Sequence, residues 1–139
     1  MLLPMSSHDD VRTVSEAILE FTRLGDVLTA AIQVHLGEEI TGNAAVGTLF
    51  QLDLGGPMRP GEIQDLTGLS SGGVTKMLDR LEAAGLVVRE YGVIPQDRRG
   101  SVVRITRKGQ RTTAKVAESV MVSLPQIKVH MKQIDAILR

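Results

Sequence analysis

The stretch PGEIQDLTGLSSGGVTKMLDRLEAAGLVVREYGVIPQDRRGSVVRITRKG, residues 60–109, decides the fold of this 139-residue chain. It opens with a short helical pattern that ends at Gly68, where a left-handed residue would close a helix. A second helical pattern follows the turn and stops at Gly85. Two valine-rich alternating runs, 86–91 and 101–106, then predict a β-hairpin. This order predicts a helix-turn-helix followed by a projecting hairpin.

The second helix of this pair, residues 71–84, has one apolar and one polar face. Its apolar residues recur at helical spacing and predict a buried stripe, made of Val74, Met77, Leu78 and Leu81. The opposite face begins with small residues, which would let the backbone approach a duplex closely. Helix N–H groups suit phosphate, and longer polar side chains suit base edges or phosphates. The candidate DNA-binding residues here are Ser70, Ser71, Gly72, Thr75, Lys76 and Arg80.

The hairpin tip carries the run Asp97-Arg98-Arg99. Arginine enters narrow minor grooves, where the negative potential is enhanced. A neighbouring aspartate can hold one guanidinium through a bidentate pair. An isolated run of this kind is more typical of a solvated turn with two surface charges. Its place after a helix-turn-helix and between two strands favours DNA contact.

Charge is unevenly distributed along the chain, although the formal net charge is zero. Residues 59–111 contain ten basic and six acidic side chains, a balance of +4, and the remainder carries −4. The positive excess therefore coincides with the helix-turn-helix, where a phosphate backbone would require it. Aromatic residues are few (Phe21, Phe50 and Tyr91), which argues against single-stranded nucleic acid, because such modules stack bases on aromatic rings.

Amphipathic helices flank this motif, within residues 9–40 and 107–139. Pro125 is expected to interrupt the C-terminal pattern and open a last, separate helix. In the first helix of the motif, Ile63 and Leu66 are expected to point inward. The flanking apolar stripes can be covered by the chain's own motif or by a second copy, and a dimeric DNA reader favours the second copy. We expect one domain over 1–139, with about 43–109 as its DNA-binding part.

Composition indicates an ordinary soluble protein, with 42% hydrophobic and 23% charged residues. No apolar run reaches the roughly 20 residues that span a membrane, and the N-terminus lacks a signal-peptide pattern. We therefore expect a cytoplasmic protein with no membrane partner. The absence of cysteine excludes disulfides, thiol redox sensing and thiolate metal sites.

Catalytic and metal-binding patterns are weak. Residues 68–72 match G-x-S-x-G, the nucleophile elbow of α/β-hydrolases, but that elbow follows a strand, and here a helical pattern precedes it. His35 lies near Glu38 and Glu39, yet a histidine and a glutamate at this spacing often coincide by chance. We therefore expect no enzyme activity, no catalytic or metal site and no cofactor.

Three segments together resemble the MarR (multiple-antibiotic-resistance regulator) family: GLSSGGVTKMLDRLEAAGLVVR, Asp97-x-Arg99 and VRITRKG. The resemblance extends over the whole chain and implies a mainly α (α+β) winged helix-turn-helix with N- and C-terminal dimerisation helices. It implies a homodimeric transcriptional repressor that binds palindromic operators in double-stranded DNA. In this arrangement the second helix would lie in the major groove, and Arg99, paired with Asp97, would enter the minor groove.

The resemblance also makes a small lipophilic or phenolic effector a hypothesis, with release from DNA as its consequence. A different hypothesis is a winged helix used for protein contact, without operator binding, because a fold alone does not fix a function. Such a module would need neither Arg98 and Arg99 on the hairpin nor small residues at the start of the second helix.

Overall fold

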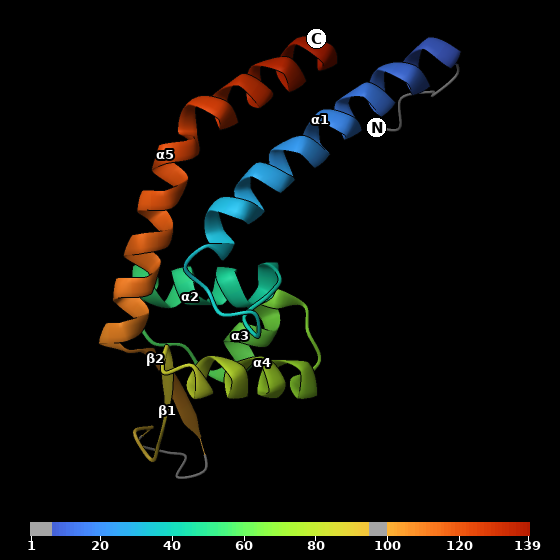
Figure 1. Cartoon of the computed structure of the whole chain (residues 1–139). Coiled ribbons are helices and arrows are strands. Elements are labelled where there is room, and N and C mark those ends of the chain that lie inside the picture. Colours follow the sequence, from blue (N-terminus) through green and yellow to red (C-terminus); the bar gives the residue numbers. More distant parts are fainter. Residues whose placement is uncertain (1–6, 95–99) are drawn as a thin grey trace. The chain divides into compact units, whose positions relative to one another are not determined.

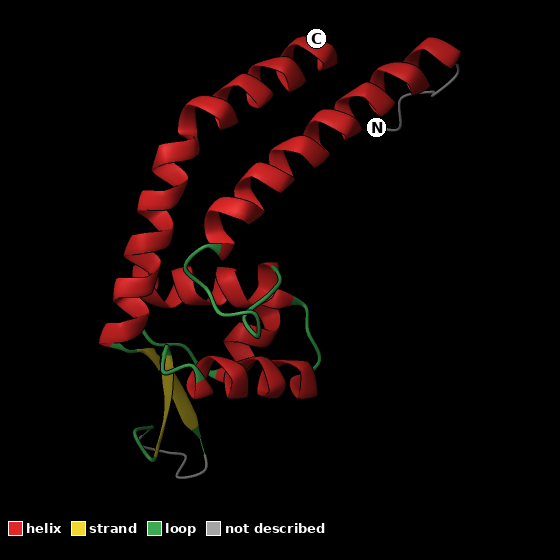
Figure 2. Ribbon diagram, viewed as in Figure 1, coloured by secondary structure: helices red, strands yellow, loops and turns green. Residues whose placement is uncertain are grey.

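The computed structural model describes residues 7–94 and 100–139, which form two compact units. One unit contains the part of the chain before His35 together with Ala117–Arg139, and the other is His35–Val116. Helices make up most of the described chain, and one hairpin provides its strands (Figure 2). Within the described ranges, no helix is both long enough and apolar enough to cross a membrane.

The second unit contains the predicted helix-turn-helix and hairpin (Figure 1). Its elements in chain order are α2 (Asn43–Gly55), α3 (Pro60–Thr67), α4 (Ser71–Ala83), β1 (Val87–Tyr91) and β2 (Ser101–Ile105). The two strands pair antiparallel, with Val87 opposite Ile105. Met58, between α2 and α3, adds an isolated bridge to Val103 and so connects the segment between these helices to the middle of β2. These elements confirm the predicted winged helix-turn-helix.

The core of this unit is built on α4. Its four predicted apolar residues are all buried, and Leu81 is fully covered. Full burial of one such side chain stabilises the fold by about 1.5–3 kcal/mol. Ile63 of α3 is also fully buried, as expected. The core cluster consists of Ile40, Ala45, Leu49, Leu52, Ile63, Val74, Met77, Leu78, Leu81, Leu86, Val87 and Val103.

Leu66 departs from the prediction, because 49% of it is exposed. The short helix α3 buries only Ile63 among its residues. Leu66 instead lines a shallow pocket that it shares with α2. The α2 residues along that pocket include Ala44 and Gly47, which are too small to cover a leucine. The helix was predicted correctly, but its buried face contains Ile63 and not Leu66.

Glycines and hydroxyls set the element boundaries in this unit. Gly68 has a φ of 71° and closes α3, and Gly85, with a φ of 75°, follows α4. Both values lie in the left-handed region that favours glycine. Thr106 caps the start of α5 (Arg107–Leu138), where its Oγ1 accepts from the Gly109 N–H at 3.0 Å. Side-chain caps of this kind satisfy N–H groups that lack a partner within the helix.

The other unit consists of α1 (His8–Gln33) and the C-terminal part of α5. The prediction that Pro125 opens a separate helix was wrong, because α5 continues through it. A proline inside a helix removes one hydrogen bond and costs about 3 kcal/mol. Ile127 and Ile134, which follow Pro125 on the same helix, are both buried. Their burial offsets the local penalty, an effect of packing that the local sequence does not show.

A polar cluster lies at the buried side of this unit. Glu20, on α1, is 8% exposed, and its carboxylate accepts from His130 Nδ1 of α5 at 3.0 Å. Arg23 donates to the same carboxylate at 2.5 Å. The hydrogen bond from His130 is the largest cause that lowers the pKa of Glu20, and partial burial opposes it. Glu20 therefore joins α1 to α5 as a hydrogen-bonded carboxylate.

Candidate nucleic-acid interface

The outer face of α4 gathers every candidate residue that the sequence placed on this helix. All six are exposed, whereas the four apolar residues of the same helix are buried. The two sets alternate at helical spacing, so burial of one set fixes the outward direction of the other. The candidates brought together in this way are Ser70, Ser71, Gly72, Thr75, Lys76 and Arg80.

The start of this face is held by hydrogen bonds of hydroxyl groups. Ser70 Oγ accepts from the Gly73 N–H at 3.1 Å and caps α4. Thr75 Oγ1 donates to the Ser71 carbonyl at 3.0 Å. Because α3 and a turn precede Ser70, and not a strand, the G-x-S-x-G match is a helix cap and not a nucleophile elbow.

The two glycines at the start of α4 have different surroundings. A Cβ at Gly73 would lie 3.3 Å from Ser70 Oγ and 3.4 Å from Leu69 Cβ, so packing within the chain favours glycine there. A Cβ at Gly72 would meet nothing within 4 Å. A glycine in a helix costs about 1 kcal/mol relative to alanine. Packing within the described chain therefore does not explain why position 72 is a glycine.

Lys76 and Arg80 supply the positive charge of this face. Both are exposed, and within the described residues neither takes part in an ion pair. Their side chains are long enough to reach a ligand beyond the surface of the helix. Arginine and lysine in such positions hydrogen-bond guanine edges or neutralise phosphates.

Arg89 of β1 joins the hairpin to α4, and sequence analysis gave it no role beyond its charge. Its Nη2 lies 2.5 Å from Asp79 Oδ1 and 3.0 Å from Glu82 Oε1. The Arg89 N–H also donates to Glu82 Oε2 at 3.1 Å. The hydrogen bonds that Arg89 donates to Glu82 lower the pKa of Glu82, and its hydrogen bonds to Glu82 and Asp79 raise the pKa of Arg89.

One signal in the sequence points to this contact. Two acids three residues apart share one face of a helix that is otherwise basic on its outer side. An arginine soon after that helix is a natural partner for them, although only the fold shows that it reaches both. The exposed carboxylate of Asp79 therefore has Arg89 as its ion-pair partner.

The hairpin has a second ion pair of its own. Arg104 of β2 donates from Nε to Glu90 Oε1 of β1 at 3.2 Å, and both side chains are more than one third exposed. The predicted minor-groove residues Asp97, Arg98 and Arg99 lie outside the described residues. Their role therefore stays a prediction from the sequence.

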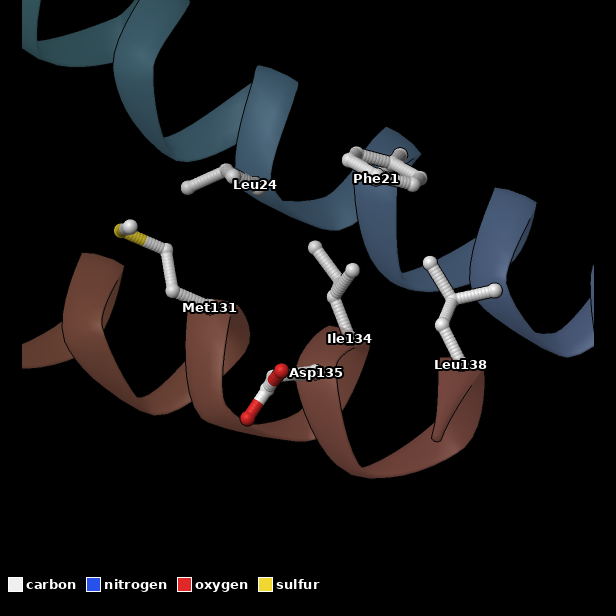
Figure 3. Close-up of a pocket in the computed structure, with 6 residues that line it drawn as sticks. All are labelled: Phe21, Leu24, Met131, Ile134, Asp135 and Leu138. Carbon is white, nitrogen blue, oxygen red and sulfur yellow. The ribbon is translucent and has the colours of Figure 1, made fainter.

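A separate apolar groove lies between α1 and α5 in the first unit (Figure 3). Its volume is about 360 Å³, and apolar side chains of the two helices face each other across it. Asp135 lies at its border and pairs with Arg139. The lining residues are Phe21, Leu24, Met131, Ile134, Asp135 and Leu138.

No group of three or more metal-ligating side chains occurs in residues 7–94 and 100–139. The combination of His35, Glu38 and Glu39 therefore does not form such a group. His130 is engaged with Glu20.

Known proteins resemble the chain both in sequence and in fold. The MarR family model matches residues 40–100. An uncharacterised HTH-type transcriptional regulator of Bacillus subtilis, YcgE, is 52% identical over 52 residues, which are 37% of this chain and 32% of that protein. The match thus spans about a third of the length of this relative.

Solved structures extend the likeness to nearly the whole chain. The transcriptional regulator Tm0710 from Thermotoga maritima is 28% identical, with a TM-score of 0.62, and the alignment covers 85% of this chain and 83% of that one. A MarR family transcriptional regulator from Streptomyces coelicolor, solved in complex with DNA, has a TM-score of 0.71 at 21% identity. That alignment covers 96% of this chain and 88% of the other, and at this identity it shows the fold alone.

The family match falls on the segment that contains α2, α3, α4 and β1, and the fold likeness includes the flanking helices. The order of these elements is the one that the sequence resemblance implied. Residues 40–100 are therefore similar to the MarR family, and the described chain has the fold of a winged helix-turn-helix.

Proposed function

We propose that this protein is a homodimeric transcriptional regulator that binds double-stranded DNA through α4, the recognition helix. One observation carries the proposal: the outer face of α4 is exposed and presents Lys76 and Arg80 without ion-pair partners in the described chain. The buried face of the same helix is anchored in the core. A rigid helix with a small-residue start and unpaired cations fits the major groove.

The hairpin is the second part of the proposed interface. Arg99, with Asp97 as its partner, enters the adjacent minor groove, and Arg98 contacts the phosphate backbone. The support for this step is the sequence run itself and the antiparallel strands that lead into it and out of it. Minor-groove arginines read groove width and so add to specificity.

Dimerisation rests on uncovered apolar surface. Apolar side chains that a monomer would leave in water lie along α1 and along α5 after Ala117. The exposed set consists of Val11, Val14, Ile18, Leu19 and Phe21 of α1 and Met121, Val122, Leu124, Val129, Met131 and Leu138 of α5. A second copy of the chain would cover such a surface symmetrically and would supply the second recognition helix that a palindrome requires.

Sedimentation velocity tests the dimer directly. Wild-type protein should sediment as a dimer, and Ile18→Asp, which places a charge at a 58% exposed position of this surface, should shift it towards monomer. The matched control is Leu54→Asp, at an 84% exposed position on α2, which should leave the dimer intact. A wild-type monomer at micromolar concentration would contradict the dimer.

Repression in the cytoplasm and release by a small lipophilic or phenolic compound complete the proposal. Their support is the similarity to the MarR family and the apolar surface of the helices in the first unit. A thermal-shift screen tests the effector, because a ligand that binds only the folded state raises the melting temperature. A compound that raises it should also weaken DNA binding, and a screen of phenolic and other lipophilic compounds without a binder would count against effector control.

Fluorescence anisotropy with labelled duplexes tests DNA binding itself. Binding should weaken steeply as salt rises, since counterions are released from the phosphates. Lys76→Ala or Arg80→Ala should lower affinity by about 1–3 kcal/mol if a base contact is lost. A phosphate contact would instead reduce the salt slope by about 1. Salt-insensitive or absent duplex binding would favour a winged helix that serves protein contact.

A further inference from the structure

We infer that Arg89 is a positioning residue for DNA binding and that it fixes β1 of the hairpin against the recognition helix through Asp79 and Glu82. This inference rests on the proposed function and assigns a role to a residue outside the predicted DNA contacts. Arg89 holds both acids with one guanidinium nitrogen and adds a backbone hydrogen bond to Glu82. These three bonds join β1 to α4.

Burial indicates that Arg89 acts inside the protein. Its side chain is 17% exposed, whereas the side chains of Asp79 and Glu82 are 58% and 41% exposed. A guanidinium that is largely covered and already engaged by two carboxylates has little capacity left for a phosphate. The two N–H groups of Arg89 Nη2 lie at fixed angles in the guanidinium plane and suit two acceptors at once, whereas the flexible, point-charge ammonium group of lysine does not reproduce that geometry.

The same contact has an electrostatic consequence. Asp79 and Glu82 are the acids of α4, and they lie on the helix that presents Lys76 and Arg80. If the two acids had no partner, they would repel the phosphates that Lys76 and Arg80 attract. Arg89 places one positive charge beside both, so the helix keeps a positive outer face. The contact therefore aligns the two DNA-reading elements and compensates the acids between them.

The hairpin supplies a matched control. Arg104 of β2 pairs with Glu90 of β1, so this pair connects the two strands and does not reach α4. Arg104→Gln removes the same charge from the same hairpin as Arg89→Gln. If Arg89 positions the hairpin, Arg104→Gln should have a small effect on the affinity for DNA, and Arg89→Gln should have a large one.

A double substitution of the acids gives a test of sign. Asp79→Asn with Glu82→Gln removes two negative charges from the surface proposed to face DNA. Simple attraction to phosphate predicts tighter binding. A positioning role predicts weaker binding, because neutral amides hold Arg89 less strongly than carboxylates do, although the protein becomes more positive. The two explanations thus predict opposite results.

The experiment uses the full chain and the duplex that the wild-type protein enriches from a random pool. Arg89→Gln should weaken binding of this duplex by about 5- to 150-fold, the range of one lost specific contact. The double acid variant should weaken it in the same direction, and Arg89→Lys should restore it only in part. Without DNA, hydrogen exchange in β1 should accelerate in Arg89→Gln and stay unchanged in Arg104→Gln.

The results distinguish failure of the DNA-binding proposal from failure of the role inferred for Arg89. Wild-type protein that enriches no duplex would overturn DNA binding and this inference together. Enrichment by the wild type with unchanged affinity in Arg89→Gln would overturn the role of Arg89 alone. Tighter binding by the double acid variant would overturn it as well, since Arg89 would then contribute by charge. Circular dichroism would show whether each variant is folded at the assay temperature.

Discussion

Gly72→Ala should move stability and DNA affinity in opposite directions. The added Cβ would meet nothing within 4 Å, so the folded chain accommodates it without strain. Replacement of glycine by alanine at such a site stabilises a protein by about 0.4–1 kcal/mol, mainly because the unfolded chain loses freedom. Gly72 lies in the first turn of α4, where helices fray, so the lower part of this range is expected.

The affinity change has the opposite sign if this turn approaches the duplex. A methyl group on the outer face of α4 would separate the helix backbone from the phosphate. A hydrogen bond to a charged group contributes about 1.5–3 kcal/mol, so loss of one such bond should weaken binding by roughly 10- to 150-fold. Close approach to DNA would also explain why glycine is present at a position where packing does not require it.

Urea unfolding and fluorescence anisotropy measure the two quantities on the same protein. Gly47→Ala is the control, because Gly47 lies inside α2 and a Cβ there also meets nothing within 4 Å. It should gain stability and keep its affinity for DNA. A Gly72→Ala variant that is more stable and binds DNA as tightly as the wild type would refute the proposed close approach.

Two further changes test the packing and the polar cluster. Gly109→Ala should destabilise the protein by about 1–3 kcal/mol in urea unfolding, because its Cβ would lie 2.3 Å from the Leu86 carbonyl oxygen and 2.6 Å from Ile105 Cγ1. Wild-type stability would show that this close packing is absent. The lowered pKa of Glu20 contributes stability above pH 4.5, its unfolded value, and the contribution is lost as pH falls through the lower folded pKa. Glu20→Gln should therefore be less stable than the wild type at neutral pH and lose less stability on acidification, and parallel pH profiles would contradict this linkage.

Local sequence signals predicted the helix-turn-helix well. The apolar spacing of α4, the Ser70 cap and the glycines that follow α3 and α4 act within a few residues. Each of these features determines local structure through backbone geometry or a nearby hydrogen bond. The fold therefore confirms the predicted motif and the exposure of its polar outer face, whereas contact of that face with DNA stays a prediction.

Features that depend on distant packing were harder to predict. Whether Leu66 is covered depends on the size of α2 side chains, and continuation of α5 past Pro125 depends on burial further along the helix. Glu20 and His130 are separated by 110 positions, so only the pairing of α1 with α5 brings them together. Arg89 reaches its acids across two elements, and no local rule fixes that geometry.

Selection of bound duplexes from a random pool tests the central claim most directly. A symmetric dimer that places its two α4 helices in two successive turns of the major groove should enrich a palindrome. Its half-site centres should be about one helical turn, or roughly 34–36 Å, apart. Enrichment of such a palindrome would support both DNA reading and dimerisation. Recovery of no preferred duplex at low salt would contradict the account.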